Sequence, residues 1–102
     1  MPQFDVYKHA IDATTHALLL DIQSDLIGII DTRVVVPLVP AARAPSAATR
    51  LNPTITVNAR HYVALFQDIQ SVDRDTLGTR VANVSKHGYD VTNALDFLFH
   101  GY

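Results

Sequence analysis

The chain has 102 residues, of which 48% are apolar and 18% charged, and it carries a net charge of −2 and no cysteine. This length indicates a single domain over residues 1–102, and the apolar share excludes a disordered chain. The absence of cysteine excludes disulfides and thiolate metal sites, and the two lysines and six arginines form no run of cations that would favour direct nucleic-acid binding.

Membrane and export signals are missing from the sequence. A helix that spans a bilayer needs roughly 20 consecutive apolar residues. The longest apolar candidate, residues 17–22, is interrupted by Asp21. The first ten residues lack a charged start followed by an apolar stretch, so no signal peptide is visible. We therefore expect a cytoplasmic protein that makes no membrane contact.

Two short β-strands are predicted near the start of the chain, because apolar and polar residues alternate there. In residues 3–7, Phe4 and Val6 share one face. In residues 17–23, one face holds three aliphatic side chains: Leu18, Leu20 and Ile22. Leu19 and Asp21 belong to the opposite face.

The next segments also predict β-structure. Residues 32–39 are rich in β-branched side chains, and Pro37 suggests an edge strand or a strand end. Residues 54–66 predict a hairpin in which residues 58–60 connect the two strands.

Residues 40–53 break this pattern with three prolines and many alanines. They predict a long connection that holds at most a short helical turn. Connections of this length in compact domains are often functional, although a solvated insertion is an equally good interpretation.

The last fifth of the chain predicts a helix. Val91, Leu95 and Leu98 recur at helical spacing and should be buried, either against the sheet or across a dimer axis. Ser85 is the expected N-cap, and Gly101 fits the C′ position. Val81 and Val84, which precede the helix, are expected in a separate turn.

Strands followed by one terminal helix predict a mostly β fold, with a small and strongly bent sheet or open barrel on which the helix packs. One helix cannot cover both faces of such a sheet. We therefore expect a homodimer to bury the remaining apolar surface.

No catalytic or metal-binding pattern is evident. The five histidines show no i, i+4 pair of the kind that binds zinc on a helix, and the four glycines are isolated and form no phosphate loop. Asp21, Asp25 and Asp31 fall on a strand end and the following loop, where turn roles are more common than acid–base chemistry. No serine lies in a nucleophile-elbow context. The sequence thus favours a protein that acts by binding, with no catalytic residue, metal or cofactor.

Four strings resemble the CcdB family of toxin–antitoxin toxins: MPQFDVYKH at the start, LLLDIQSDLI at 18–27, TRVVVPL at 32–38 and NALDFLFHGY at 93–102. The resemblance implies a homodimer with an SH3-like barrel of the CcdB/MazF-Kid type. It also implies binding to the A subunit of DNA gyrase, which traps the enzyme on cleaved DNA. A CcdA-like antitoxin would neutralise the toxin, and the complex would repress its own operon with operator DNA contacted only through the antitoxin.

The resemblance also implies two sets of contact residues. The gyrase contact would comprise the loop after the second strand and the chain end: Leu26, Ile27, Asp96, Phe99, His100, Gly101 and Tyr102. His100 stands where the family's best-known member has tryptophan, Asp96 where it has asparagine, and Tyr102 where it has isoleucine. The antitoxin contact would comprise residues from the first loop and the long connection: Lys8, His9, Asp12, Thr14, Arg43 and Arg50.

Two alternative functions remain. A MazF/Kid-like endoribonuclease would share the fold, but it needs charged groups arranged in a groove for RNA. A CcdB-like antitoxin-binding module that has lost gyrase activity is suggested by His100, because tryptophan is a stronger hot-spot residue.

Overall fold

A computed structural model describes residues 2–10, 17–27, 30–44 and 50–101. These residues contain strands, short 3₁₀ segments and one terminal helix. The strands are β1 (Asp5–His9), β2 (Leu18–Asp21), β3 (Thr32–Pro40), β4 (Thr54–Val57), β5 (Arg60–Ala64), β6 (Gln70–Asp73) and β7 (Leu77–Asn83). The helical segments are η1 (Asp25–Ile27), η2 (Ala41–Arg43), η3 (Phe66–Asp68), η4 (Arg74–Thr76), η5 (Ser85–His87) and α1 (Gly88–His100).

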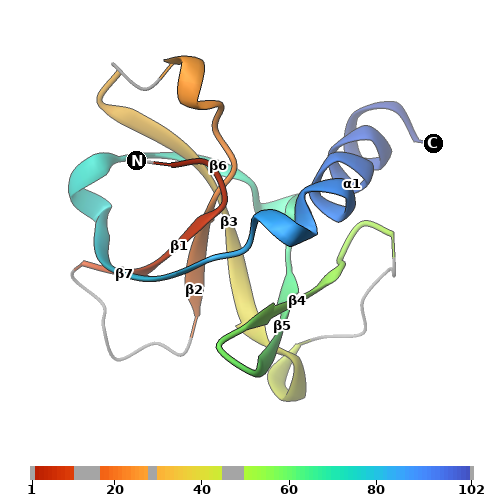
Figure 1. Cartoon of the computed structure of the whole chain (residues 1–102). Helices are drawn as coiled ribbons and strands as arrows, with labels where there is room; N and C mark the ends of the chain where they lie inside the picture. The colour runs from red at the N-terminus through yellow and green to blue at the C-terminus, as the bar shows by residue number, and fades with distance from the viewer. Residues whose placement is uncertain (1, 11–16, 28–29, 45–49, 102) are drawn as a thin grey trace.

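One antiparallel sheet holds the strands in the order β4-β5-β3-β2-β1-β7. The strand β6 lies off this path and pairs with the first half of β3, whereas β5 pairs with the second half. The sheet curls into a half-barrel, and α1 lies on one side of it (Figure 1). The pairing of β1 with β7 shifts register between Val6 and Tyr7 and again between Tyr7 and His9. Such irregularities increase local twist and bend a sheet. The predicted fold class, a mostly β bent sheet with one C-terminal helix, is confirmed.

Pro37 lies inside the central strand β3, so the prediction of an edge strand or strand end was wrong. Its neighbour on β2 is Leu19, and its carbonyl accepts a hydrogen bond from the amide of Leu65 at 3.0 Å. The N–H and C=O of a strand residue point to the same side. The missing N–H of Pro37 therefore faces the place where the partner of β3 changes from β6 to β5, and no ladder bond is lost.

The predicted hairpin is confirmed, with a connection of only two residues. Asn58 and Ala59 both have positive φ angles, 50° and 68°, and Arg60 already belongs to β5. Two successive positive φ values are typical of the tight turn that matches strand twist.

The main core lies between one face of the sheet and α1. Val6, Leu20 and Val36 come from the three central strands and are fully buried with Val91 and Ala94 of the helix. The alternating face predicted for residues 17–23 is thereby confirmed. The opposite face of the same strands is buried as well.

The predicted helical stripe is only partly correct. Val91 is buried, but Leu95 and Leu98 are half-buried, and the second buried position on α1 is Ala94. Leu95 still packs against the core from its edge. The backbone of α1 comes closest to η3 and η5, and the short side chain of Ala94 is fully buried in the core.

Residues 70–83 were not predicted as strands, and Val81 lies in β7 instead of a turn. The side chains of these two strands are mostly exposed or half-buried. They therefore do not show the alternation of buried and exposed positions by which a strand is recognised. The predicted turn at Val84 is confirmed, since its carbonyl accepts a hydrogen bond from the amide of His87.

Ser85 does not cap the helix. Instead, the side chain of Asn83 accepts a hydrogen bond from the amide of Ser85 at 3.1 Å, and α1 begins only at Gly88. A Cβ at Gly88 would lie 3.4 Å from the Phe4 ring, which is ordinary van der Waals contact, so the helix start lies next to the N-terminal segment. Gly101 closes the helix as predicted, with a φ of 77° and its amide bonded to the carbonyl of Phe97.

No helix among the described residues is both long and apolar enough to cross a bilayer.

The complete burial of Ala94 predicts a sharp penalty for added volume. Ala94→Leu should lower the free energy of unfolding by about 1–3 kcal/mol, because the fully buried site has no room for three more carbons. Thr92→Leu adds a leucine at an exposed position of the same helix and should change the stability by no more than about 0.5 kcal/mol. Urea melts of both variants test this prediction, and an unchanged midpoint for Ala94→Leu would contradict the observed packing.

Candidate functional site

A buried ion pair joins the end of β2 to the start of β3. The guanidinium of Arg33 donates from Nε to Asp21 Oδ2 at 2.7 Å and from Nη2 to Asp21 Oδ1 at 3.0 Å. Both side chains have 0% exposure. Two parallel hydrogen bonds in this geometry fix the relative placement of the two side chains. Arg33 lies in the predicted strand at residues 32–39, and nothing in the sequence marks it as the partner of Asp21.

The connection after β2 is built on this pair. The amide of Gln23 donates to Asp21 Oδ1 at 3.0 Å, and its side-chain oxygen accepts from the amide of Val34 at 3.0 Å. Farther along, Asp25 accepts a hydrogen bond from the amide of Gln3 at 2.6 Å. Asp21 and Asp25 therefore have the structural roles that their positions predicted.

Leu26 lies at the outer end of this connection, in η1. Its side chain is 95% exposed, and its amide is held by the hydroxyl of Ser24 at 3.2 Å. Ile30, on the return path to β3, is also exposed. Ile27 ends η1, and its side chain lies outside the described part of the chain. The loop predicted to contact gyrase thus presents an aliphatic side chain on an anchored backbone.

The second predicted contact segment is the end of α1. Phe99 is 67% exposed, and Asp96, His100 and Gly101 are exposed beside it. Tyr102 lies outside the described residues. In Figure 1, η1 lies at the upper left and the end of α1 at the upper right, so the two predicted contact segments lie on opposite sides of the upper part of the molecule.

Arg50 belongs to the helix end and not with Arg43. Its guanidinium carbon lies 5.1 Å from the centre of the Phe97 ring, which is a cation–π distance. A cation in the last turn also interacts favourably with the helix dipole. The prediction grouped Arg50 with the antitoxin contacts because it lies in the long connection. Sequence alone gives no signal for its contact with Phe97.

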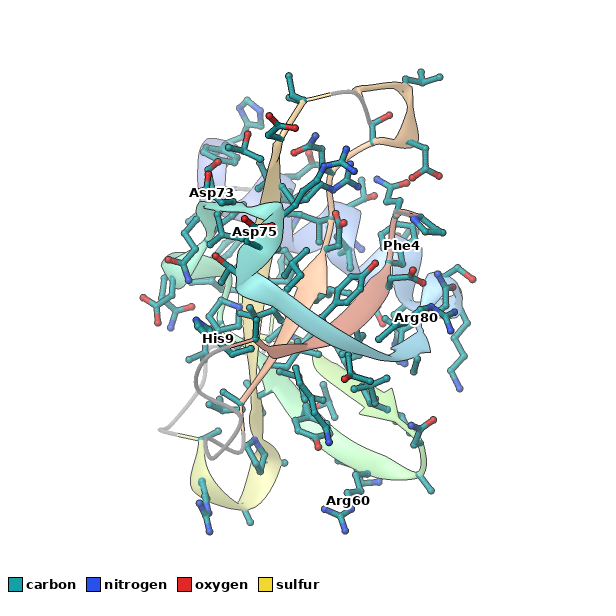
Figure 2. All side chains as sticks on the ribbon, turned by 90° about the vertical axis from the view of Figure 1, so that its left-hand side faces the viewer. Phe4, His9, Arg60, Asp73, Asp75 and Arg80 are labelled. Carbon is teal, nitrogen blue, oxygen red and sulfur yellow. The ribbon has the colours of Figure 1, made fainter. Side chains whose placement is uncertain are left out.

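The other predicted antitoxin residues lie elsewhere. Lys8 is exposed and His9 half-buried at the end of β1, and Arg43 is exposed in η2. His9 lies in the lower half of Figure 2, and η2 lies at the lower end of Figure 1. Asp12 and Thr14 fall outside the described residues. The end of β1 and η2 are separate parts of the surface in Figure 1, and Arg50 lies apart from both, against Phe97.

A second buried polar group connects β1 to β7. The hydroxyl of Tyr7 donates to Asp5 Oδ2 at 3.2 Å, and Asp5 Oδ1 accepts from Asn83 at 2.9 Å and pairs with Arg80 at 3.0 Å. Burial raises the pKa of Tyr7 to about 12, and the negative charge and hydrogen bond of Asp5 add to this shift. Asp5 and Tyr7 are both buried, so this cluster serves the sheet and is closed to a substrate.

The described residues line hollows on the surface, of which the following pair bears on the site. One, of about 440 Å³, is lined by Asp31, Asp73, Arg74 and Asp75. The other, of about 370 Å³, lies between η2 and the β4–β5 turn and is lined by residues 40–42 and 59–62. In Figure 2, Asp73 and Asp75 lie in the upper half of the molecule and Arg60 lies at the bottom. Among the described residues, no group of three or more histidines or carboxylates is placed to hold a metal ion.

Comparison with known proteins yields two findings. A family model described as CcdB protein matches residues 3–101. The fold is similar to a solved structure described as an endoribonuclease in complex with its cognate antitoxin from Mycobacterial species, with a TM-score of 0.73 and 16% sequence identity. That match covers 94% of this chain and 92% of the other. At this identity the likeness shows a shared fold and no more.

The buried ion pair predicts an asymmetric mutational response. Asp21→Ala should destabilise the fold by about 3–5 kcal/mol, because it leaves the charge of Arg33 buried without its carboxylate. The double variant Asp21→Leu/Arg33→Met should cost clearly less than the sum of its two single changes. Asp90→Ala removes an exposed carboxylate near His87 and should cost less than about 1 kcal/mol. Denaturant melts of these variants, together with the single changes Asp21→Leu and Arg33→Met, test the prediction, and strict additivity would contradict the coupling.

The Tyr7 hydroxyl predicts a loss of stability at alkaline pH. Between pH 10 and about 12 the unfolded chain releases the phenolic proton while the folded protein retains it. The unfolded state then binds fewer protons, so the free energy of unfolding falls as the pH rises. The contribution is complete below pH 10, and about 2–3 kcal/mol should disappear across this window. Urea melts from pH 9 to 11.5 should show a shallower decline for Tyr7→Phe, and equal declines would contradict the assignment.

Proposed function

The chain belongs to the CcdB family, the toxins of toxin–antitoxin systems, and on this premise we propose that it binds the A subunit of DNA gyrase and traps the enzyme on cleaved DNA. In this proposal the protein acts by binding and not by catalysis. It works in the bacterial cytoplasm, where its target is found.

One observation carries the proposal. Leu26 and Phe99 are exposed apolar side chains on two separate elements, η1 and α1, and each is held by an ordered backbone. Burial of an apolar side chain contributes about 1.5–3 kcal/mol, and a few such anchors provide most of the energy of an interface. A contact surface that is already ordered also loses little conformational entropy on binding.

The polar residues around Phe99 define the contact further. Arg50 adds a cation next to the helix end, so the proposed gyrase surface contains a residue from the long connection. His100 and Asp96 supply an imidazole and a carboxylate. Together with Ile27, Gly101 and Tyr102, these residues form the surface that we propose for gyrase.

The proposed antitoxin contact uses other parts of the surface. We propose that Lys8, His9 and Arg43 contact a CcdA-like antitoxin, and that Asp12 and Thr14 lie in the same contact. Operator DNA is then bound by the antitoxin, which agrees with the net negative charge of this chain. A homodimer is also proposed, and the half-buried Leu98 beside the exposed Phe99 is available for that contact.

The test measures gyrase-mediated DNA cleavage. The purified protein should convert supercoiled plasmid into protein-linked linear DNA when gyrase from the same organism and ATP are present. Phe99→Ala should raise the concentration required at least tenfold, the loss expected of a central aromatic anchor. Tyr89→Ala is the matched control, because Tyr89 is a 79% exposed aromatic residue at the other end of α1 and should have no effect.

Two results would contradict the proposal. One is the absence of any trapped cleavage complex at high protein concentration. The other is an equal loss for Phe99→Ala and Tyr89→Ala, which would remove the helix end from the contact. An RNA substrate incubated with the same preparation should remain intact, and its cleavage would favour the endoribonuclease alternative.

A further inference from the structure

The path of the curled sheet ends at β4 on one side and at β7 on the other, and side chains join these two ends. The side-chain amide of Asn58, in the β4–β5 turn, donates to the carbonyl of Val81 in β7 at 3.3 Å. The backbone amide of Thr56, in β4, donates to Nε2 of His87 at 3.3 Å. His87 belongs to η5, which lies above β4 in Figure 1, where the chain passes from β7 into α1. We call the junction formed by these two hydrogen bonds the seam.

Thr56 is an edge residue of the sheet. It lies opposite His61 in the β4–β5 pairing, and the N–H and C=O of a strand residue point to the same side. Because its N–H points to His87, the main chain of Thr56 faces away from β5 and toward the seam. The neighbouring Ile55 and Val57 are buried in the core and hold β4 in place. Proteins usually cover the unpaired main chain of an edge strand, and here an imidazole covers it.

The seam bond requires one particular form of the imidazole. A ring nitrogen accepts a hydrogen bond only when it carries no proton, and in a neutral imidazole the other nitrogen then carries it. Nε2 of His87 faces an N–H donor, so this geometry assigns the proton to Nδ1, which lies 3.5 Å from Asp90 Oδ2. When the ring gains a second proton, two donors face each other at Thr56 and the bond is lost. The His87 side chain is only 16% exposed, which leaves little room for water to take its place.

The charged and titratable groups around the ring act in different directions. Asp90, in the first turn of α1, attracts a protonated ring through Nδ1 and so draws it away from Thr56. The start of α1 is the positive end of the helix dipole, and Lys86 precedes the ring in η5, so both oppose an added positive charge. His61, on β5, places a second imidazole 3.3 Å from the hydroxyl of Thr56. Its effect on the seam has to be separated from that of His87.

We propose that His87 is a pH-operated latch of the half-barrel: the neutral ring closes the seam on β4, and the protonated ring turns to Asp90 and releases the edge of β4. Acidification through the range in which an imidazole gains its proton, around pH 6.5, thereby uncovers the amide and carbonyl of Thr56. Ile55 and Val57 stay buried on either side, so the release is confined to the seam. The latch is a property of the fold and does not depend on the proposed toxin activity.

Amide hydrogen exchange of the whole protein, followed by NMR at pH 7.5 and pH 5.0, tests the latch. Each rate is divided into that of an unstructured peptide at the same pH, which removes the intrinsic pH dependence of exchange. A free imidazole is about 30 times more often protonated than neutral at pH 5. The protection of the Thr56 amide should therefore fall at least tenfold between the two pH values. The protection of the amides in β2 and β3 should stay constant, because only the seam opens.

Matched variants assign the effect to one ring. His87→Gln places a side-chain oxygen near the position of Nε2, and this acceptor does not titrate, so the protection of Thr56 should be equal at both pH values. His61→Gln makes the same substitution in the other imidazole beside Thr56, and the tenfold fall should persist. His87→Ala removes the acceptor and should give low protection at both pH values.

Nitrogen-15 spectra of the wild-type imidazoles give a second measurement that needs no variant to fold. At pH 7.5, Nε2 of His87 should carry no proton, and a proton on Nε2 would overturn the proposal. Constant protection of Thr56 in the wild type, an equal fall in His87→Gln, or loss of the fall in His61→Gln would also overturn it. A parallel fall in the β2 and β3 amides would do so as well, because the whole fold would then be opening. Gyrase trapping is measured separately with the Phe99 and Tyr89 variants, so the latch and the proposed function can fail independently.

Discussion

The ion pair between Asp21 and Arg33 is the constraint on which the rest of the structure depends. Removing two charges from water costs several kcal/mol for each ion, and this cost is offset only by good geometry and further hydrogen bonds. Asp21 meets that requirement through two bonds from Arg33 and one from the amide of Gln23, while its own carbonyl accepts from the amide of Phe4 at 2.7 Å. One side chain and its backbone thus tie the N-terminal segment, β2, β3 and the connection between them.

The placement of the exposed residues follows from this constraint. Because Gln23 is fixed from both sides, η1 leaves the sheet in one direction and Leu26 cannot fold back onto the core. At the helix end, the left-handed conformation of Gly101 stops α1 immediately after His100. A residue with a Cβ would resist that conformation by roughly 1–2 kcal/mol. Both exposed segments are therefore consequences of local backbone chemistry inside the fold.

Sequence patterns predicted the features that depend on local order. The alternation around Leu20, the hairpin at Asn58 and the glycine cap of α1 are each set by neighbouring residues, and all three are confirmed. Other features depend on residues distant in the chain and could not be inferred. Pro37 is tolerated in a central strand only because β3 changes partners there, and Arg50 reaches Phe97 only through the tertiary fold. The contact residues themselves stay predictions, because nothing in the chain's own packing tests what binds to them.

Different parts of the surface suit different shapes of partner. Leu26 and Phe99 protrude from η1 and α1, and a protruding apolar side chain is buried only where the partner offers a pocket. Such pockets are features of folded surfaces, so these two side chains suit a folded partner. The hollow between η2 and the β4–β5 turn has the opposite shape, and it is filled only by a side chain that protrudes from the partner. The same chain therefore offers two kinds of shape complementarity on separate elements of one sheet-and-helix scaffold.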